Sequence, residues 1–335
     1  MTGKKPTALR AFVSAALLMT LLGTVPAQAQ LIPLLGGQRA GISSLQFLKI
    51  GTGARAVAMA EAFIAVADDA SSLHYNPAGM VQASGHELMF SHTSWVVDLQ
   101  HEFVAGIYRL SEQDAVGLSF TSLHTEDMEV RTETQPFGTG RYFNYGDIAV
   151  GLSYARQLTS QFSFGATVRY VEESIDVLKT RALMIDLGTY YWTGLGSTRF
   201  SVAVTNFGNN VSPEGTVDLP HGEEVSSFQE FSPPTLFRIG FAFEPIEDNV
   251  NRLTASAQLN HPNDNSENLA LGMEYAWNET FFVRAGYKLN VDEEGLTAGA
   301  GVNAPIGIGR GGVDYAYADF GRLGGVHRIT VRLGL

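Results

Sequence analysis

The chain has 335 residues, a formal net charge of -12 and no cysteine. The acidic balance argues against a nucleic-acid partner, because binding to phosphates needs a basic surface. The absence of cysteine excludes disulfides and thiol chemistry, so packing and backbone pairing have to hold the fold together.

Residues 1–29 have the layout of a secretory signal peptide. Basic residues in the first ten positions precede an apolar stretch over 11–25, and the small residues Ala27 and Ala29 follow it. The apolar stretch is shorter than the roughly 20 residues that a membrane-spanning helix needs, so we expect cleavage after Ala29 rather than a membrane anchor. The sequence therefore predicts an exported protein.

Residues 30–84 differ from the leader and from everything that follows. The many alanines over 54–67 favour a helix whose small side chains allow close approach to a neighbouring backbone. Asp68 and Asp69 then interrupt this helix, and Asn76-Pro77 enforces an extended or turn geometry. We predict a compact plug, or hatch, over this region.

From residue 85 to 335, segments of about ten residues alternate apolar with polar or small side chains. In the last segment, for example, Ile329 and Val331 alternate with Arg328 and Arg332. About fourteen segments can be counted, an even number that suits a bacterial outer-membrane barrel. The pattern predicts an all-β transmembrane antiparallel β-barrel, and a soluble periplasmic β-protein is the alternative. The segments lie near 86–97, 101–110, 113–123, 143–158, 161–172, 180–192, 198–206, 235–245, 250–260, 267–277, 280–290, 295–304, 311–319 and 325–335.

The lengths of the connections separate these two alternatives. Connections after even-numbered segments are short, as at 110–114 and 277–280, whereas the two longest, 124–142 and 206–234, follow odd-numbered segments. Outer-membrane barrels place short turns on the periplasmic side and long loops outside, and a soluble sandwich has no reason to sort its loops in this way. Aromatic side chains near segment ends, Trp192 among them, also suit a lipid boundary.

Charged residues on the polar face of these segments would point into the barrel. Inside a bilayer-spanning wall they have to pair with each other, with water or with the hatch, and their mixed signs favour a structural lining over an ion-selective channel. We also predict that Arg55 and Asp68 or Asp69 of the hatch pair with oppositely charged residues of the lumen. The inward charges are Arg169, Asp186, Arg238, Glu244, Glu274, Arg284, Lys288, Asp314, Arg328 and Arg332.

No catalytic, cofactor or metal site is recognisable. Two adjacent carboxylates, Asp68 and Asp69, are too few for a calcium cage, so we expect them to cap a helix or bond to the hatch backbone. Gly307, Gly309 and Gly312 match a dinucleotide-binding motif only formally, because they join two strand-like segments. We therefore expect a protein that is not an enzyme and needs no cofactor.

The run FLKIGTGARAVAMAEAFIAVADDASSLHYNPAGM, residues 47–80, resembles the N-terminal signature of the PorV/PorQ family. These are outer-membrane proteins related to the FadL-type long-chain fatty-acid transporters. The resemblance implies a fourteen-stranded barrel with an N-terminal hatch and an association with type IX protein secretion. The sequence departs from the family at Ala60, where glycine is usual, at His74, and at the final residue, Leu335. The residues of the hatch motif are Arg55, Asp68, Asp69, Asn76, Pro77 and Gly79.

The resemblance implies two candidate functions in the lipid of the bacterial outer membrane. PorV-like members receive secreted cargo proteins and pass them to a surface-attachment complex, and here the acidic loops 124–142 and 206–234 would contact cargo or other secretion components. FadL-type members instead pass hydrophobic small molecules through a lumen and a lateral opening. Neither function requires catalysis.

Overall fold

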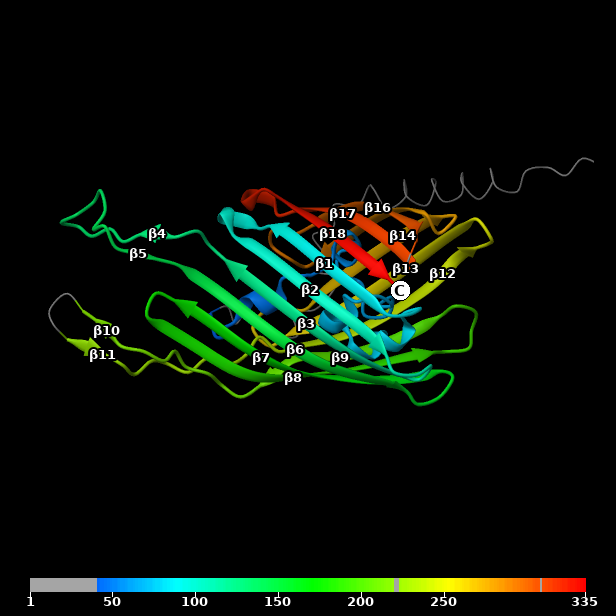
Figure 1. Cartoon of the computed structure of the whole chain (residues 1–335), viewed down its shortest axis with the longest axis horizontal. Coiled ribbons are helices and arrows are strands. Elements are labelled where there is room, and N and C mark those ends of the chain that lie inside the picture. The colour runs from blue at the N-terminus through cyan, green and yellow to red at the C-terminus, as the bar shows by residue number, and fades with distance from the viewer. Residues whose placement is uncertain (1–40, 220–222, 308) are drawn as a thin grey trace, which may run out of the picture. The chain divides into compact units, whose positions relative to one another are not determined.

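The computed structural model describes residues 41–219, 223–307 and 309–335. This part of the chain forms a closed barrel of fourteen antiparallel strands, shown in Figure 1. The fold class predicted from the alternating pattern is thereby confirmed. The signal peptide expected over 1–29, and the predicted start of the hatch at residue 30, lie outside the described residues.

The barrel strands follow one another around the wall in chain order, and β1 pairs with β18 to close it. The predicted segments differ from the observed strands by no more than three residues at either end. The barrel strands are β1 Glu87–Ser94, β2 Gln100–Arg109, β3 Asp114–His124, β6 Tyr145–Gln157, β7 Phe162–Ile175, β8 Leu178–Trp192, β9 Arg199–Gly208, β12 Leu236–Glu247, β13 Asn251–Pro262, β14 Asn268–Trp277, β15 Phe281–Leu289, β16 Leu296–Ile306, β17 Gly309–Asp319 and β18 Gly325–Gly334.

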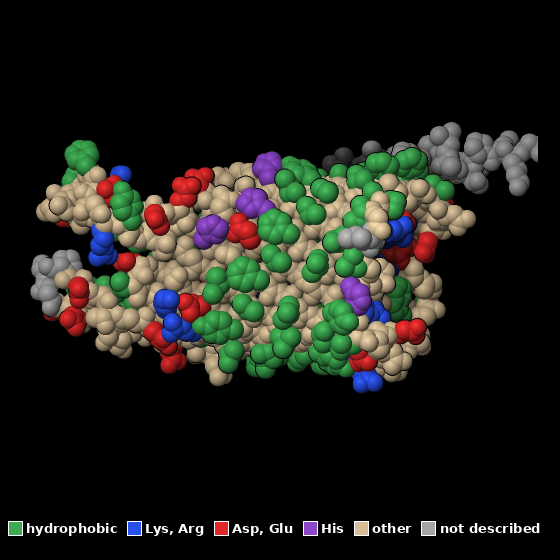
Figure 2. All heavy atoms as spheres, in the orientation of Figure 1, with side chains coloured by type: hydrophobic (Ala, Val, Ile, Leu, Met, Phe, Trp, Pro, Cys, Tyr) green, Lys and Arg blue, Asp and Glu red, His purple; other side chains and the backbone are tan. Residues whose placement is uncertain are grey.

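The apolar face of each strand points outward. On β14, Leu271 and Met273 are exposed, whereas Glu274, which follows Met273, is fully buried. Figure 2 shows hydrophobic side chains over the middle of the wall and charged side chains gathered toward its two ends. This is the arrangement of a membrane barrel and the reverse of a soluble sandwich. No described helix is long and apolar enough to cross a membrane.

One predicted boundary aromatic faces the other way. Trp192 lies on the inward side of β8, where its indole nitrogen donates a hydrogen bond to Oε1 of Gln82 at 3.1 Å. The aromatic side chain therefore contacts the segment inside the barrel rather than the lipid boundary. Neighbouring Tyr191, on the opposite face, is exposed as expected.

The two long connections follow β3 and β9 and project from the same end of the barrel (Figure 1). Each folds into a small hairpin that the sequence pattern did not predict. We call this end the long-loop end and the opposite one the short-turn end. The hairpins consist of β4 Met128–Glu129 with β5 Tyr142–Phe143, and of β10 Val217–Asp218 with β11 Glu224–Val225.

Residues 41–84, which we call the hatch segment, lie inside the barrel and lead into β1. The predicted helix over 54–67 is wrong in length, because it ends after Ala58. Ala60 and Glu61 have positive φ angles of 53° and 60°, which reverse the chain there. We retain the domain division at residues 84 and 85 as a proposal. The helices of the structure are η1 Gln46–Lys49, α2 Ala54–Ala58, α3 Ser72–Tyr75, η2 Pro77–Gln82, η3 Val96–Asp98 and η4 Gly321–Leu323.

Candidate functional site

Neutral side chains of the wall hold the backbone of the hatch segment. Oγ1 of Thr330 accepts a hydrogen bond from the amide of Ala54 at 2.8 Å, and Oγ1 of Thr297 accepts one from Ala60 at 3.0 Å. A buried amide without a partner is costly, so these bonds fix the position of the segment. The sequence reasoning missed both threonines because it followed charges, although their inward register would have identified them.

Glycines on the wall let the hatch segment approach the strands closely. A Cβ atom at Gly272 of β14 would lie only 2.6 Å from the carbonyl oxygen of Met59. A Cβ at Gly286 of β15 would overlap the backbone at Met59 and Ala60 in the same way. Met59 and Ala60 of the hatch segment therefore lie directly against the backbone of two neighbouring strands.

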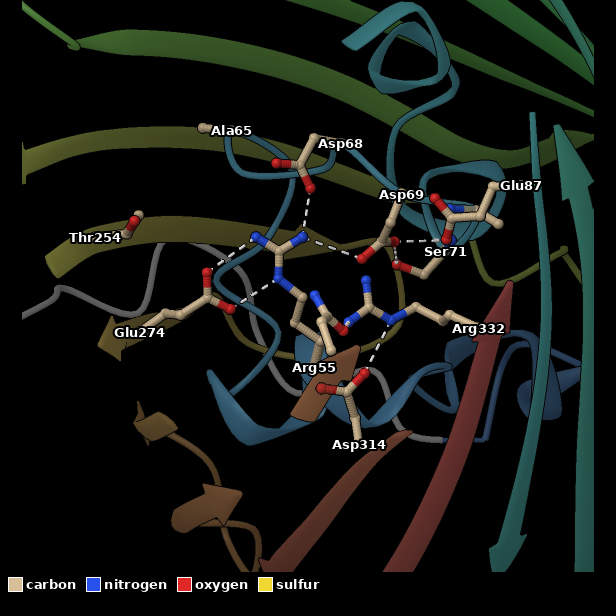
Figure 3. A network of polar contacts seen from close by, with 12 residues as sticks. Arg55, Ala65, Asp68, Asp69, Ser71, Glu87, Thr254, Glu274, Asp314 and Arg332 are labelled. Atoms are coloured by element: carbon tan, nitrogen blue, oxygen red, sulfur yellow. Dashed lines mark hydrogen bonds and ion pairs between the residues drawn. The ribbon is translucent and has the colours of Figure 1, made fainter. Parts of the chain in front are cut away.

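Arg55 is the centre of a buried ion-pair network, shown in Figure 3. Its Nε and Nη2 donate to the two carboxylate oxygens of Glu274 on β14, at 2.8 and 3.1 Å. Its Nη1 donates to Asp68 and, at 3.1 Å, to Asp69. Arg55 thus joins the wall to the hatch segment itself, whereas Asp68 and Asp69 have their closest ion-pair partner within that segment.

The network continues around the wall through three further strands. Nε of Arg284 on β15 lies 2.7 Å from Glu274, and its Nη1 lies 2.6 Å from Asp314 on β17. Nε of Arg332 on β18 lies 2.9 Å from the other oxygen of Asp314. Positive and negative groups alternate along this series of ion pairs, so the charges form a paired structural lining of the lumen.

Asp69 connects the network to the next helix. Its Oδ1 accepts hydrogen bonds from the amide and the hydroxyl of Ser71, at 3.0 and 2.5 Å, just before α3 begins. Burial by itself would raise the pKa of Asp69, but Arg55 and Arg332 outweigh burial and hold this pKa below its ordinary value. The carboxylate is therefore charged in the folded barrel.

Asn76, Pro77 and Gly79 have structural contacts. Oδ1 of Asn76 accepts from the amide of Ala78 at 3.1 Å, while its Nδ2 donates to the carbonyls of Ile64 and Thr189 at 2.9 and 3.1 Å. Pro77 begins η2, and a Cβ at Gly79 would overlap the carbonyl of Ala67. Asn76 therefore joins two turns of the hatch segment to β8.

A second group of ion pairs lies at the long-loop end. Nζ of Lys288 on β15 lies 2.8 Å from Glu61 and 2.7 Å from Glu294. Nζ of Lys49 lies 2.9 Å from Asp264 in the connection between β13 and β14. The sequence reasoning missed Lys49, Glu61, Asp264 and Glu294, because residues outside the strands have no inward or outward register.

Three other predicted lumen charges pair within the wall, and two do not. Arg169 lies 2.7 Å from Asp186, and Glu244 lies 2.6 Å from Arg199, a cation that the sequence reasoning missed although it is on the inward register of β9. Arg238 and Arg328 are buried, yet each has a guanidinium nitrogen without a hydrogen-bond partner among the described residues.

This geometry defines a class of protein. A closed barrel with an apolar outer wall surrounds a hatch segment that ion pairs and hydrogen bonds fix to at least five strands. Within the described ranges, no group of three or more His, Asp or Glu side chains could hold a metal ion. The molecule is an outer-membrane β-barrel with a filled lumen.

A family model described as type IX secretion system protein PorV matches residues 36–262. The match spans more than half of the chain, and the chain therefore belongs to the PorV family of outer-membrane proteins. The resemblance seen at residues 47–80 and the association with type IX secretion are thereby confirmed. The family and its barrel fold are in general non-enzymatic. No curated protein matches the sequence.

Solved structures share the barrel fold at low sequence identity. The toluene transporter TbuX of Ralstonia pickettii has a TM-score of 0.59 at 14% identity, over 85% of this chain and 98% of its own. The monoaromatic hydrocarbon channel CymD has a TM-score of 0.56 at 14% identity, over 84% of this chain and 96% of its own. The toluene transporter TodX of P. putida has a TM-score of 0.54 at 11% identity, over 84% and 96%. These likenesses support the FadL-like fold.

Proposed function

We propose that this barrel is a docking platform for type IX secretion. In this proposal, secreted cargo and other secretion components bind the connections 124–142 and 206–234 at the long-loop end, and no cargo passes through the lumen. The observation that carries the proposal is the hatch segment, which the Arg55 network fixes across the barrel. A lumen filled in this way suits a protein that works with its outer surface.

The two hairpins offer chemistry suited to a protein partner. Each is a two-stranded sheet with open edges, to which an extended segment of a partner can add a strand. Phe137, between β4 and β5, is 94% exposed, and aromatic side chains are frequent anchors of interfaces. Acidic residues such as Glu133 and Glu223 surround these edges and would favour a basic partner surface.

The wall beneath the hairpins is the tallest part of the barrel. Strands β6, β7 and β8 have 13, 14 and 15 residues, whereas β1 has 8. At the top of this wall Glu172 lies 2.9 Å from Lys179 and 2.8 Å from Arg181, which ties β7 to β8. The hairpins would thus lie next to the long strands β6, β7 and β8, which extend further at the long-loop end than β1 on the opposite side of the barrel.

Passage of a hydrophobic small molecule is the second candidate. It requires an apolar path between the hatch segment and the wall, but the hollows between them are lined by charged groups such as Arg55, Arg284 and Glu61. An apolar solute that passed through these hollows would displace water from the charged groups, and loss of their hydration is unfavourable. The filled lumen therefore supports docking over transport of apolar molecules.

The test removes the tip of the first hairpin. A variant in which 131–139 is replaced by Gly-Gly should still be recovered from the outer membrane with heat-modifiable gel mobility, because the barrel strands are intact. We expect it to lose co-purifying cargo and to fail to restore secretion in a deletion strain. A matched variant with 321–323 replaced by Gly-Ser, at the same end of the barrel, should behave as the wild type. Normal secretion by the hairpin variant would refute the docking proposal.

A further inference from the structure

Two buried guanidinium groups of the lumen each have a nitrogen without a hydrogen-bond partner among the described residues. Arg328 on β18 is 2% exposed and Arg238 on β12 is 3% exposed. Nη2 of Arg328 and Nη1 of Arg238 have no hydrogen-bond partner within the described part of the chain. Nε of Arg328 donates to Oγ1 of Thr93 at 2.6 Å, and the guanidinium of Arg238 lies 5.7 Å from the centre of the Tyr75 ring. Because arginine stays charged, both groups can donate to an anion.

Both groups line hollows near the long-loop end. The first hollow has a volume of about 210 Å³ and the second about 160 Å³. The two hollows adjoin, because they share Lys49, Glu61 and Glu294 as lining residues. Arg328 lines the first hollow together with the apolar side chains of Ile50, Val57, Trp95 and Phe320.

The carboxylates that line both hollows, Glu61 and Glu294, already form ion pairs with Lys288. Lys288 lies 2.8 Å from Glu61 and 2.7 Å from Glu294. Among the described residues, neither acid lies within ion-pair distance of Arg328 or Arg238. Lys288, Arg238 and Arg328 carry three positive charges against the two negative charges of Glu61 and Glu294, so one extra negative charge would balance the group. A ligand with several negative charges would be repelled by the two acids. The chemistry therefore selects a monoanion.

The volume and the lining residues of the first hollow limit further which anions would fit. An engineered cavity of about 150 Å³ in another protein holds benzene, so a volume of about 210 Å³ can take a ring with a small polar group. Trp95 and Phe320, whose rings are 5.0 Å apart, form an aromatic wall suited to such a body. An inorganic anion would leave this wall unused.

We propose that the hollow between the hatch segment, Trp95 and Arg328 binds a compact monocarboxylate with an apolar body. The carboxylate accepts hydrogen bonds from the guanidinium group of Arg328, and the apolar body packs against Trp95 and Phe320. Arg238 supports the anion electrostatically from the adjoining hollow. This ligand site does not depend on the docking of proteins at the hairpins.

The test measures binding of radiolabelled benzoate to the full-length mature barrel in maltoside micelles by equilibrium dialysis. We expect saturable binding, and a loss of affinity of at least about tenfold in the variant Arg328→Met, because a hydrogen bond from a charged group to a buried anion is lost. Replacement of an unpaired buried cation by an apolar side chain of similar length leaves the barrel folded. Heat-modifiable gel mobility of this variant checks that point.

A matched variant removes a cation at the same end of the barrel. Arg322 in η4 is exposed and pairs with Glu293, so Arg322→Met should bind benzoate as the wild type does. Quenching of fluorescence by benzoate should disappear in Trp95→Phe, which places the probe in the first hollow. If Arg322→Met weakened binding as much as Arg328→Met, the effect would be one of net charge and the proposed site would be wrong.

Two further probes separate the parts of the proposal. Benzyl alcohol has the same apolar body without the charge, and equal affinity for it in wild type and Arg328→Met would overturn the role of the anion. Inorganic phosphate has charge without an apolar body, and competition by phosphate as strong as by benzoate would overturn the role of Trp95 and Phe320. Absence of saturable benzoate binding to the wild type would overturn the proposal as a whole.

Discussion

Arg55 and Glu274, which are 219 positions apart, form a buried ion pair with two parallel hydrogen bonds of 2.8 and 3.1 Å. Such a bidentate pair fixes both distance and orientation. It joins helix α2 of the hatch segment to β14, so the position of the segment depends on the register of the wall.

Replacement of Arg55 by methionine should loosen the hatch segment. The change leaves Asp69 and Glu274 buried with fewer cations, and breaking a buried pair by removing one partner typically costs about 3–5 kcal/mol. We expect a lower urea midpoint in detergent and faster influx of a chromogenic β-lactam into cells. The matched variant Arg156→Met removes an exposed cation and should change neither quantity. Unchanged influx in Arg55→Met would contradict the sealing role of the network.

Replacement of Gly272 by valine should prevent the hatch segment from reaching the wall. A Cβ at this position would lie 2.6 Å from the carbonyl oxygen of Met59, which is backbone and cannot rotate away. We expect increased protease sensitivity of the hatch segment in the purified barrel. Gly307→Val is the control, because nothing lies within 4 Å of a Cβ there. Equal protease resistance in both variants would refute close packing at Gly272.

Replacement of Ala60 by glycine should stabilise the protein. Ala60 has a φ of 53°, in the left-handed region where a side chain costs roughly 1–2 kcal/mol and glycine does not. We expect a gain of up to about 1 kcal/mol in the free energy of unfolding, measured by urea titration in micelles. Ala58→Gly, in the neighbouring helix α2, should instead lose about 1 kcal/mol. A loss in both variants would show that contacts of the Ala60 methyl group outweigh its backbone strain.

Acid should release the contribution of Asp69 to stability. Its folded-state pKa is lowered below the ordinary value of about 3.9, because Arg55 and Arg332 outweigh the effect of burial. A carboxylate with a lowered folded-state pKa stabilises the fold above its unfolded pKa and loses this effect as pH falls through the folded pKa. The difference in urea midpoint between wild type and Asp69→Asn should therefore shrink as the pH falls below about pH 4. A difference that grew toward acid pH would contradict this sign.

The wall of the barrel could be predicted from the sequence because its signal has period two. On β18, Ile329 and Val331 are exposed and Arg328 is buried, as the alternation of apolar and polar residues indicated. Sorting of loop lengths also predicted that the two long connections share one end of the barrel, where Figure 1 shows them. The hairpins in the long connections carried no such signal, because strands of two residues are too short for any periodicity.

The hatch segment was predicted less well, for two physical reasons. Helix propensity favoured an alanine-rich helix over 54–67, but tertiary contacts override propensity, and the bonds at Ala60 and Ile64 hold a tight reversal instead. Pairing between distant charges, such as Lys49 with Asp264, depends on where the chain turns inside the barrel. Neither position follows from spacing in the sequence.

The pairing of β1 with β18 has a consequence for the order of assembly. The hatch segment leads directly into β1. Its backbone amides donate to side chains of β13, β16 and β18, and its Arg55 side chain donates to β14, and these strands are synthesised last. Because the segment is bonded to strands on several sides of the lumen, we expect it to be in place before β1 and β18 meet. Barrel closure and hatch insertion are then one event, and Gly272→Val should delay the appearance of the heat-modifiable form in a pulse-chase experiment.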